Sequence, residues 1–266
     1  MESEQVNRDP SVEAAWRVLG EIASIFRPLG DRAVLIGGWI PYLLYGSQHI
    51  GSTDVDLALN VSQISPEETR QILDSLTQCG YRRSPDRAFT WIRDVDSDRG
   101  ETIVVEVDLL SPAGMALGTG SLETFGARGC DFALRDSRAM TFAGTLPDGR
   151  PAQVNLAVAT ETAFIVTKAM ALMGRTDPKD AYDIYFCVRH HPHGAGAFGA
   201  SFRRLLDQPV VLEALAKIRY IFRSISSEGS SDVATVLNTG DPGERARLKR
   251  DALEQVSAFL NAAGVP

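Results

Sequence analysis

The chain has 266 residues, of which 44% are hydrophobic and 23% are charged, and its formal net charge is −7. This composition is typical of a soluble globular protein of one large or two small domains. The negative charge excludes a surface that is basic all over, so any polyanion would have to bind a local basic patch. The three cysteines are far apart and the N-terminus is polar, so a cytoplasmic location without a signal peptide is expected. No apolar run is long enough to cross a bilayer, and no membrane partner is expected.

Residues 11–110 predict alternating helices and strands. Apolar side chains recur at helical spacing over 11–27, with Ser11 as the predicted N-cap. A short buried strand over 33–38 ends at Gly37-Gly38. The further elements predicted from capping residues, turn residues and apolar runs are a short helix over 39–46, a strand over 53–61, a helix over 65–80 capped by Ser65, and strands over 88–94 and 101–110.

The second half of the sequence predicts a change to helical structure. Residues 111–150 are rich in small residues and predict only a hairpin over 140–154, around Pro147-Asp148-Gly149. From about residue 155 the pattern is helical, and the Gly/Ser stretch 226–232 is predicted to be a surface loop. The predicted helices cover 160–174, 177–191, 207–225 and 243–263. The expected fold is therefore α/β (α+β), with a mixed sheet and flanking helices over 1–150 and a helical half over 151–266.

Two aspartates interrupt the apolar strand "TDVDLAL". Side chains alternate between the two faces of a strand, so Asp54 and Asp56 share one face, and the apolar residues Val55, Leu57 and Leu59 enter the core from the other. Two neighbouring carboxylates repel each other unless a cation neutralises them. Oxygen ligands at this spacing suit Mg²⁺, with Mn²⁺ as an alternative.

A second acidic strand, "VVEVDLL", carries Glu106 and Asp108 on one face. If this strand lies beside the first, a third carboxylate joins the pair. Three carboxylates can hold two divalent ions about 3.5–4 Å apart, an arrangement that stabilises the attacking and leaving oxygens of phosphoryl transfer. Both Glu106 and Asp108 are candidates for the third ligand, and Asp108 is preferred because two leucines follow it.

The glycine pair Gly37-Gly38 precedes the first acidic strand by a short predicted helix. Glycine lets the backbone approach a phosphate closely. The stretch "GGWIPYLLYGSQHIGSTDVDLAL" (37–59) resembles the signature of the DNA-polymerase-β-like nucleotidyltransferase superfamily, which has a glycine pair, a spacer, Asp-x-Asp and a later acidic strand. Within it, the AbiEii-type, toxin-like group is most similar, because "TKAMALMGRTDPKDAYDIYF" resembles its Lys…Lys-Asp-x-x-Asp helix. The resemblance covers 33–60, 101–110 and 160–187.

The resemblance implies a nucleotidyltransferase-type sheet, with the helical half closing the active-site cleft. Asp54, Asp56 and Asp108 would be the catalytic and metal-binding residues. The triphosphate of a nucleoside triphosphate (NTP) would contact the backbone and hydroxyl of the residues near the motif, and lysines of the helical half would face its phosphates. By this resemblance, the residues that bind the nucleotide are Gly37, Gly38, Ser52, Lys168, Lys179 and Asp183, the last of which would orient a lysine or the acceptor.

Other interpretations of these residues exist. Lys168 and Lys179 are also typical of surface lysines whose stems cover apolar area, and Asp180 and Asp183 are also typical of a helix N-terminus. The basic run Arg82, Arg83 and Arg87 is a candidate polyanion patch. The histidines His190, His191 and His193 are predicted to form an exposed helix end rather than a metal site.

Three functional hypotheses follow. The first is a Mg²⁺-dependent nucleotidyltransferase, ATP being one candidate NTP, that acts on a tRNA, protein or small-molecule hydroxyl. Its expected role is that of a toxin in a toxin–antitoxin or phage-defence system, with an antitoxin as a possible partner and no DNA substrate. The second is an antibiotic-modifying nucleotidyltransferase. The third is a non-catalytic nucleotide-binding module on the same fold.

Overall fold

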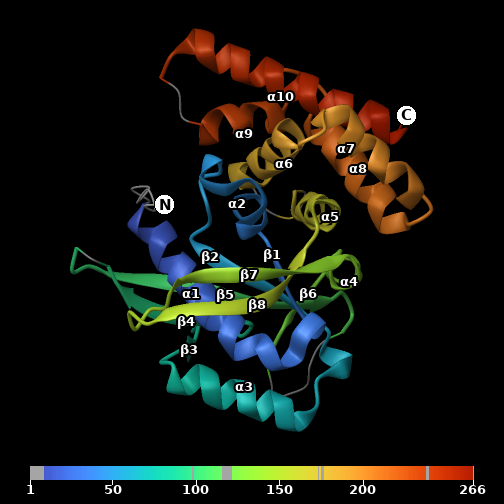
Figure 1. Cartoon of the computed structure of the whole chain (residues 1–266). Coiled ribbons are helices and arrows are strands. Elements are labelled where there is room, and N and C mark those ends of the chain that lie inside the picture. Colours follow the sequence, from blue (N-terminus) through green and yellow to red (C-terminus); the bar gives the residue numbers. More distant parts are fainter. Residues whose placement is uncertain are drawn as a thin grey trace. The chain divides into compact units, whose positions relative to one another are not determined.

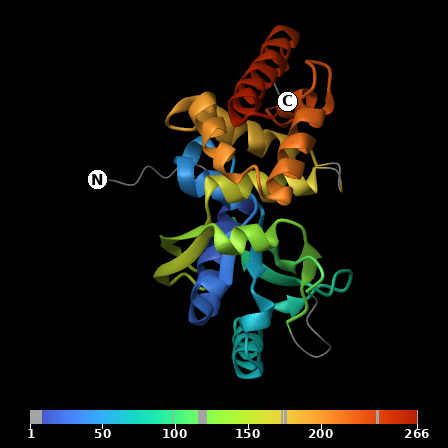
Figure 2. The same cartoon turned by 90° about the vertical axis from the view of Figure 1, so that its right-hand side faces the viewer.

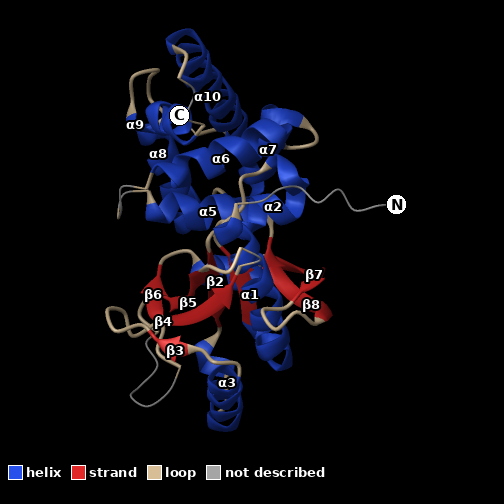
Figure 3. Ribbon diagram, turned by 90° about the vertical axis from the view of Figure 1, so that its left-hand side faces the viewer, coloured by secondary structure: helices blue, strands red, loops and turns tan. Residues whose placement is uncertain are grey.

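The computed structural model describes residues 9–97, 99–115, 122–172, 174, 177–237 and 240–265. The polar N-terminus over 1–8 and residue 173 of the helix predicted over 160–174 lie outside the described residues. The chain divides into two compact units, Met1–Thr160 and Glu161–Pro266. All described strands belong to the first unit, and the described elements of the second unit are helices (Figure 3). The predicted mixed sheet with helices, followed by a helical half, is confirmed. Among the described residues, no helix combines the length and apolar character needed to cross a membrane.

The first unit is built on one mixed sheet, which contains eight strands in the described part of the chain. Its order is β3-β4-β5-β2-β1-β8-β7, and β6 pairs with β5 (Figure 1). The central strand β2 is antiparallel to β1 and parallel to β5. The two acidic strands of the sequence, β2 and β5, are therefore direct neighbours. The strands are β1 (Ala33–Ile36), β2 (Asp54–Leu59), β3 (Arg82–Arg83), β4 (Thr90–Asp96), β5 (Thr102–Pro112), β6 (Phe125–Ala127), β7 (Ser137–Thr145) and β8 (Pro151–Ala159).

Helices α1, α2 and α4 of the first unit pack against the sheet, and α3 packs against α1. The first, α1, packs against β5, β7 and β8, and its side chains Val18, Leu19 and Ile22 are fully buried. Its N-cap is Asp9, whose Oδ1 accepts a hydrogen bond from the Ser11 backbone N–H at 2.8 Å, so the predicted Ser11 cap is wrong. The reason is that Pro10 is already the first helical residue, a position that suits proline. The helices are α1 (Pro10–Phe26), α2 (Trp39–Tyr45), α3 (Pro66–Gln78) and α4 (Cys130–Arg135), with 3₁₀ turns Arg27–Arg32, Gly46–Gln48 and Val61–Gln63.

Two local predictions in the first unit are confirmed. Ser65 is the N-cap of α3: its hydroxyl accepts from the Glu68 N–H, and the Glu68 carboxylate accepts from the Ser65 N–H at 2.9 Å. The predicted hairpin is the antiparallel pair β7–β8. Strand β8 continues to Ala159, however, so the helical pattern predicted from residue 155 is wrong over 155–159. The reason is that β8 also pairs with β1, through Leu35 and Val158, which keeps the chain extended. Residue 150, the domain boundary predicted from the sequence, falls in the turn of this hairpin.

The second unit is a bundle of helices. Its last helix, α10, packs against α6, α7 and α9, and Figure 2 shows these later helices in orange to red. The sequence did not predict α7 or α9, and the predicted loop over 226–232 is wrong because α9 begins within it. Gly229 explains the error: a Cβ there would lie 2.6 Å from Cγ2 of Ile221, so the small residues serve close packing. The elements are α5 (Glu161–Ala171), α6 (Pro178–His190), α7 (Gly194–Phe202), the 3₁₀ turn Arg203–Leu205, α8 (Pro209–Ile221), α9 (Glu228–Val236) and α10 (Pro242–Ala263).

Candidate active site

Four carboxylates lie on one face of the sheet in the first unit. In the parallel pairing of β2 with β5, Asp54 is the partner of Glu106 and Asp56 is the partner of Asp108. Partnered residues on adjacent strands point to the same face. The residues between them, Val55 and Val107, are fully buried on the opposite face. The structure therefore brings together the two acidic strands in the register that the alternation of side chains predicts.

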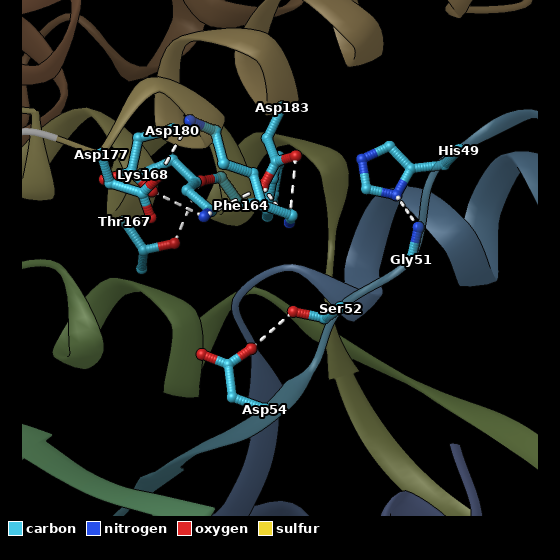
Figure 4. A network of polar contacts seen from close by, with 11 residues as sticks. His49, Gly51, Ser52, Asp54, Phe164, Thr167, Lys168, Asp177, Asp180 and Asp183 are labelled. Atoms are coloured by element: carbon cyan, nitrogen blue, oxygen red, sulfur yellow. Dashed lines mark hydrogen bonds and ion pairs between the residues drawn. The ribbon is translucent and has the colours of Figure 1, made fainter. Parts of the chain in front are cut away.

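Asp54 is fixed by two neighbours at the start of β2. Its Oδ1 accepts a hydrogen bond from the Ser52 hydroxyl at 2.5 Å (Figure 4). Its backbone carbonyl accepts a hydrogen bond from Nε1 of the fully buried Trp39 at 2.8 Å. Just before it, Nδ1 of the buried His49 accepts from the Gly51 N–H at 3.1 Å. These contacts set the position of Asp54, and they place Ser52 directly beside a carboxylate.

The glycine pair lies against the second aspartate. Gly37 has a positive φ of 76°, and a Cβ at this position would be only 1.9 Å from Oδ2 of Asp56. Gly38 follows as the N-cap of α2. A residue with a side chain at position 37 would therefore have both a strained backbone and a clash with the carboxylate. Gly37 makes the space that Asp56 occupies.

Asp108 is held by a hydroxyl and a guanidinium. The Thr90 hydroxyl donates to its Oδ1 at 2.6 Å, and Nη1 of Arg87 lies 3.5 Å from its Oδ2. Arg87 also forms an ion pair with Glu106 through Nη2. The Asp108 side chain is 18% exposed, against 45% for Glu106, so Asp108 is the more enclosed of the two candidate third ligands.

The surroundings of Asp108 change its acidity. Burial raises the pKa of its carboxyl above the ordinary value, and the charges of Glu106 and Asp54 raise it further. The hydrogen bond from Thr90 and the charge of Arg87 act in the opposite direction. Sequence reasoning did not identify Thr90, and it noted Arg87 only as part of a basic run. Both contacts depend on strand pairing, because Thr90 is the register partner of Asp108 on β4.

Oxygen donors are concentrated on this face. It gathers four carboxylates, with the hydroxyl of Ser52 beside Asp54, and carboxylate and hydroxyl oxygens are donors that hard divalent cations prefer. In the part of the chain that the structure describes, no three His, Cys, Asp or Glu side chains are gathered closely enough to hold a metal ion as they stand. The types of donor on this face fit Mg²⁺ or Mn²⁺, and Asp54, Asp56 and Asp108 are the residues that would hold it.

The predicted lysines of the second unit form a cluster with two aspartates. Nζ of the buried Lys168 lies 2.7 Å from Oδ1 of Asp180 and 3.0 Å from Oδ2 of Asp183 (Figure 4). Nζ of Lys179 lies 3.0 Å from Oδ2 of Asp183, one helical turn away. Burial acts to lower the pKa of Lys168, but the charges of Asp183 and Asp180 outweigh it and raise the pKa above the ordinary value. Lys168 thus forms a buried ion pair with Asp180 and Asp183. The Lys179 side chain, in contrast, is 25% exposed.

A cleft of about 460 Å³ also lies in the first unit, between α1, α4 and the strands β7 and β8. Leu19, Ile22 and Leu57 are among its apolar lining residues, and Arg135 and Arg138 among its polar ones. None of the residues predicted as site residues lines it. This cleft is separate from the four carboxylates.

Comparisons with known proteins give structural likenesses and no sequence relative. No protein-family model matches the chain, and no curated protein matches it significantly. Among solved structures, the chain is similar to an antigenic nucleotidyltransferase-like protein from Paracoccidioides brasiliensis, with 15% sequence identity and a TM-score of 0.45. The match covers 77% of this chain and 87% of that chain. A likeness at this level does not assign a function. The function has to be inferred from the residues of the chain itself.

Proposed function

We propose that the chain is a nucleotidyltransferase that depends on a divalent metal ion and transfers a nucleoside monophosphate from an NTP to a hydroxyl acceptor. The observation that carries this proposal is the pairing of Asp54 with Glu106 and of Asp56 with Asp108 on one sheet face, beside Gly37. Carboxylates gathered on one face repel each other, and a bound cation relieves this repulsion. Four carboxylates on one face suit a metal that carries phosphates.

The residues of the site have separate tasks in this reaction. Asp54, Asp56 and Asp108 would hold the metal, which supplies neutralisation of the phosphate charge when bound. Ser52 and Thr90 keep two of these carboxylates in position through their hydroxyls. Gly37 leaves room for the Asp56 carboxylate, and the backbone of Gly37 and Gly38 would contact the triphosphate. The acceptor oxygen forms a bond to the α-phosphorus, the bond to pyrophosphate breaks, and the hydroxyl proton passes to a carboxylate or to water. Catalysis then consists mostly of positioning and charge neutralisation.

The lysine cluster divides into two roles under this proposal. Lys168 is a structural ion-pair partner, because its ammonium is buried between Asp180 and Asp183. Lys179 has the more exposed ammonium, which suits a phosphate oxygen. Asp183 orients both lysines.

The physiological role proposed with this activity is that of a toxin in a toxin–antitoxin or phage-defence system. It is supported by the resemblance of the Asp-x-Asp and Lys-Asp-x-x-Asp motifs alone. An antibiotic-modifying enzyme or a non-catalytic nucleotide-binding module on the same fold are the alternatives. Expression of the chain with and without a co-encoded small protein, and growth on aminoglycosides, would distinguish the first two roles.

The proposed activity is tested by release of pyrophosphate from each of the four NTPs with Mg²⁺ or Mn²⁺, and by transfer of labelled nucleotide to tRNA, protein and small-molecule acceptors. We expect Asp54→Asn and Asp56→Asn to lose transfer. Asp74→Asn is the matched control, because Asp74 is an exposed aspartate on α3. Metal-independent NTP binding that survives Asp54→Asn would contradict the proposal.

A further inference from the structure

Two phenylalanine rings face solvent beside the carboxylates. Phe89 directly precedes β4 and Phe125 begins β6. Their ring centroids are 5.2 Å apart with an interplanar angle of 38°. Phe125 is 53% exposed and Phe89 is half-buried. The guanidinium of Arg87 lies 5.7 Å from the centre of the Phe89 ring. An aromatic pair with a cation beside it is a surface on which flat rings stack.

Strand pairing places this aromatic pair next to Asp108. The Leu109 N–H donates to the Phe89 carbonyl at 3.0 Å, and Leu110 is the register partner of Phe125. Leu110 follows Asp108 by two residues, so Phe125 is on the same face of the sheet as the carboxylates, about 7 Å further along the strand direction. Arg87 joins the two features, because it pairs with Glu106 and Asp108 and also lies over Phe89.

The order of the strands indicates which substrate this surface meets. Leu110 pairs with Ala58 of β2 on one side and with Phe125 of β6 on the other. The glycine pair follows β1, beyond β2, so it and the phenylalanines lie on opposite sides of the carboxylates. In phosphoryl transfer the attacking and leaving oxygens are roughly in line. With pyrophosphate on the glycine side, the acceptor hydroxyl comes from the side of the phenylalanines.

We propose that Phe89 and Phe125 bind a nucleobase at the end of a single-stranded RNA acceptor, and that Arg87 contacts its backbone phosphate. This inference rests on the proposed nucleotidyltransferase function and names its acceptor. A nucleobase would stack on the two rings, and a backbone phosphate would contact the guanidinium. A polycationic aminoglycoside has no aromatic face that could stack on the two rings. A protein acceptor would need neither feature.

Binding of a fluorescein-labelled, short single-stranded oligoribonucleotide to the full chain, without NTP, tests the inference by fluorescence anisotropy. Each stacked base contributes enough that Phe125→Ala should weaken binding about tenfold or more. Phe125→Trp should retain it. Tyr220→Ala is the matched control and should leave binding unchanged, because Tyr220 is also 53% exposed and also lies under an arginine, Arg223. A deoxyribonucleotide of the same sequence measures how far the 2′-hydroxyl contributes.

Failure of the inference and failure of the proposed function give different results. Equal binding by wild type and Phe125→Ala, or equal losses in Phe125→Ala and Tyr220→Ala, would overturn the inference. Nucleotide transfer to a protein at a rate that Phe125→Ala leaves unchanged would also overturn it, while the proposed function would stand. Oligonucleotide binding that requires Phe125, without pyrophosphate release from any NTP, would support the nucleic-acid site and contradict the transferase activity.

Discussion

The carboxylate face of the first unit and the lysine cluster of the second unit differ in how far their charged side chains are exposed and paired. On the carboxylate face, strand pairing gathers Asp54, Asp56, Glu106 and Asp108, and the guanidinium of Arg87 pairs with Glu106 and Asp108. In the lysine cluster, Lys168 and Lys179 meet Asp180 and Asp183, two charges of each sign, and both aspartates are almost completely buried. The first is partly exposed, with the Glu106 side chain at 45% and Asp108 at 18%, whereas Lys168, Asp180 and Asp183 of the second are buried.

Under the proposed function, this difference distinguishes binding residues from supporting residues. A buried ion pair such as that of Lys168 is costly to break. Carboxylates gathered on a partly exposed face lower their mutual repulsion when a cation binds. Residues marked by one sequence resemblance would therefore have different tasks, according to their burial.

The largest expected effect is the loss of the buried cation. Lys168→Met leaves the Asp180 and Asp183 carboxylates short of a partner, and we expect it to lower the free energy of unfolding by about 3–5 kcal/mol. Lys179→Met removes a partly exposed lysine and should cost less than about 1 kcal/mol. Urea denaturation followed by circular dichroism measures both. If the two variants lose equal stability, the cluster does not act as a closed ion-pair core.

The next effect concerns the space beside Asp56. Both Gly37 and Gly46 have a positive φ, so alanine at either position should cost roughly 1–2 kcal/mol in backbone strain. Only at Gly37 would the new Cβ meet a neighbour, since nothing lies within 4 Å of a Cβ at Gly46. We expect Mg²⁺ and NTP together to raise the melting temperature of the wild type and of Gly46→Ala, but not that of Gly37→Ala. Retention of that rise in Gly37→Ala would show that Asp56 can move without loss of the site.

A smaller effect is expected at the hydroxyl that holds Asp108. Thr90→Val removes the hydrogen bond to this enclosed carboxylate and should cost roughly 1–2 kcal/mol. Because that hydrogen bond lowers the pKa of Asp108, its loss raises the pKa further. The carboxylate is then protonated at a higher pH, so Mn²⁺ binding should be lost earlier as the pH falls, as electron paramagnetic resonance can measure. Thr102→Val removes a similar bond to the exposed Asp96 on the same sheet and should leave this pH dependence unchanged.

The smallest expected effect concerns the surface ion pair between Arg32 and Glu68. Arg32 hydrogen-bonds to Glu68 and, together with hydrogen bonds from the backbone N–H and the hydroxyl of Ser65, lowers the pKa of this carboxyl from 4.5 to about 2. A lowered pKa in the folded state stabilises the protein above the unfolded pKa, and this stabilisation is lost as the pH falls from about 4.5 towards 2. Glu68→Gln should therefore be less stable than the wild type at neutral pH and equally stable near pH 2. Glu67→Gln, on the same turn, is the control, and thermal unfolding across this pH range compares the two. A constant difference at every pH would contradict this explanation.

Local rules made the acidic strands predictable. Alternation along "TDVDLAL" and "VVEVDLL" is enough to place Asp54 with Asp56, and Glu106 with Asp108, because neighbours on a strand point to opposite faces. The capping box of Ser65 and Glu68 and the hairpin turn at Pro147-Asp148-Gly149 follow from short-range chemistry in the same way. α9 was missed for the opposite reason, since its Gly/Ser sequence is typical of a loop and its helix depends on packing against Ile221 and Phe222.

What the sequence by itself determined is the placement of the main groups: carboxylates that share a face, a glycine pair before the first acidic strand, and a helical second half. What only the tertiary structure decided is which residues support that chemistry. The pairing of β4 with β5 brings Thr90 to Asp108, and the course of the chain before β4 brings Arg87 to Glu106. The pairing of β6 with β5 brings Phe125 to the same face. These contacts join residues distant in the sequence, and no local pattern specifies which strand lies beside which.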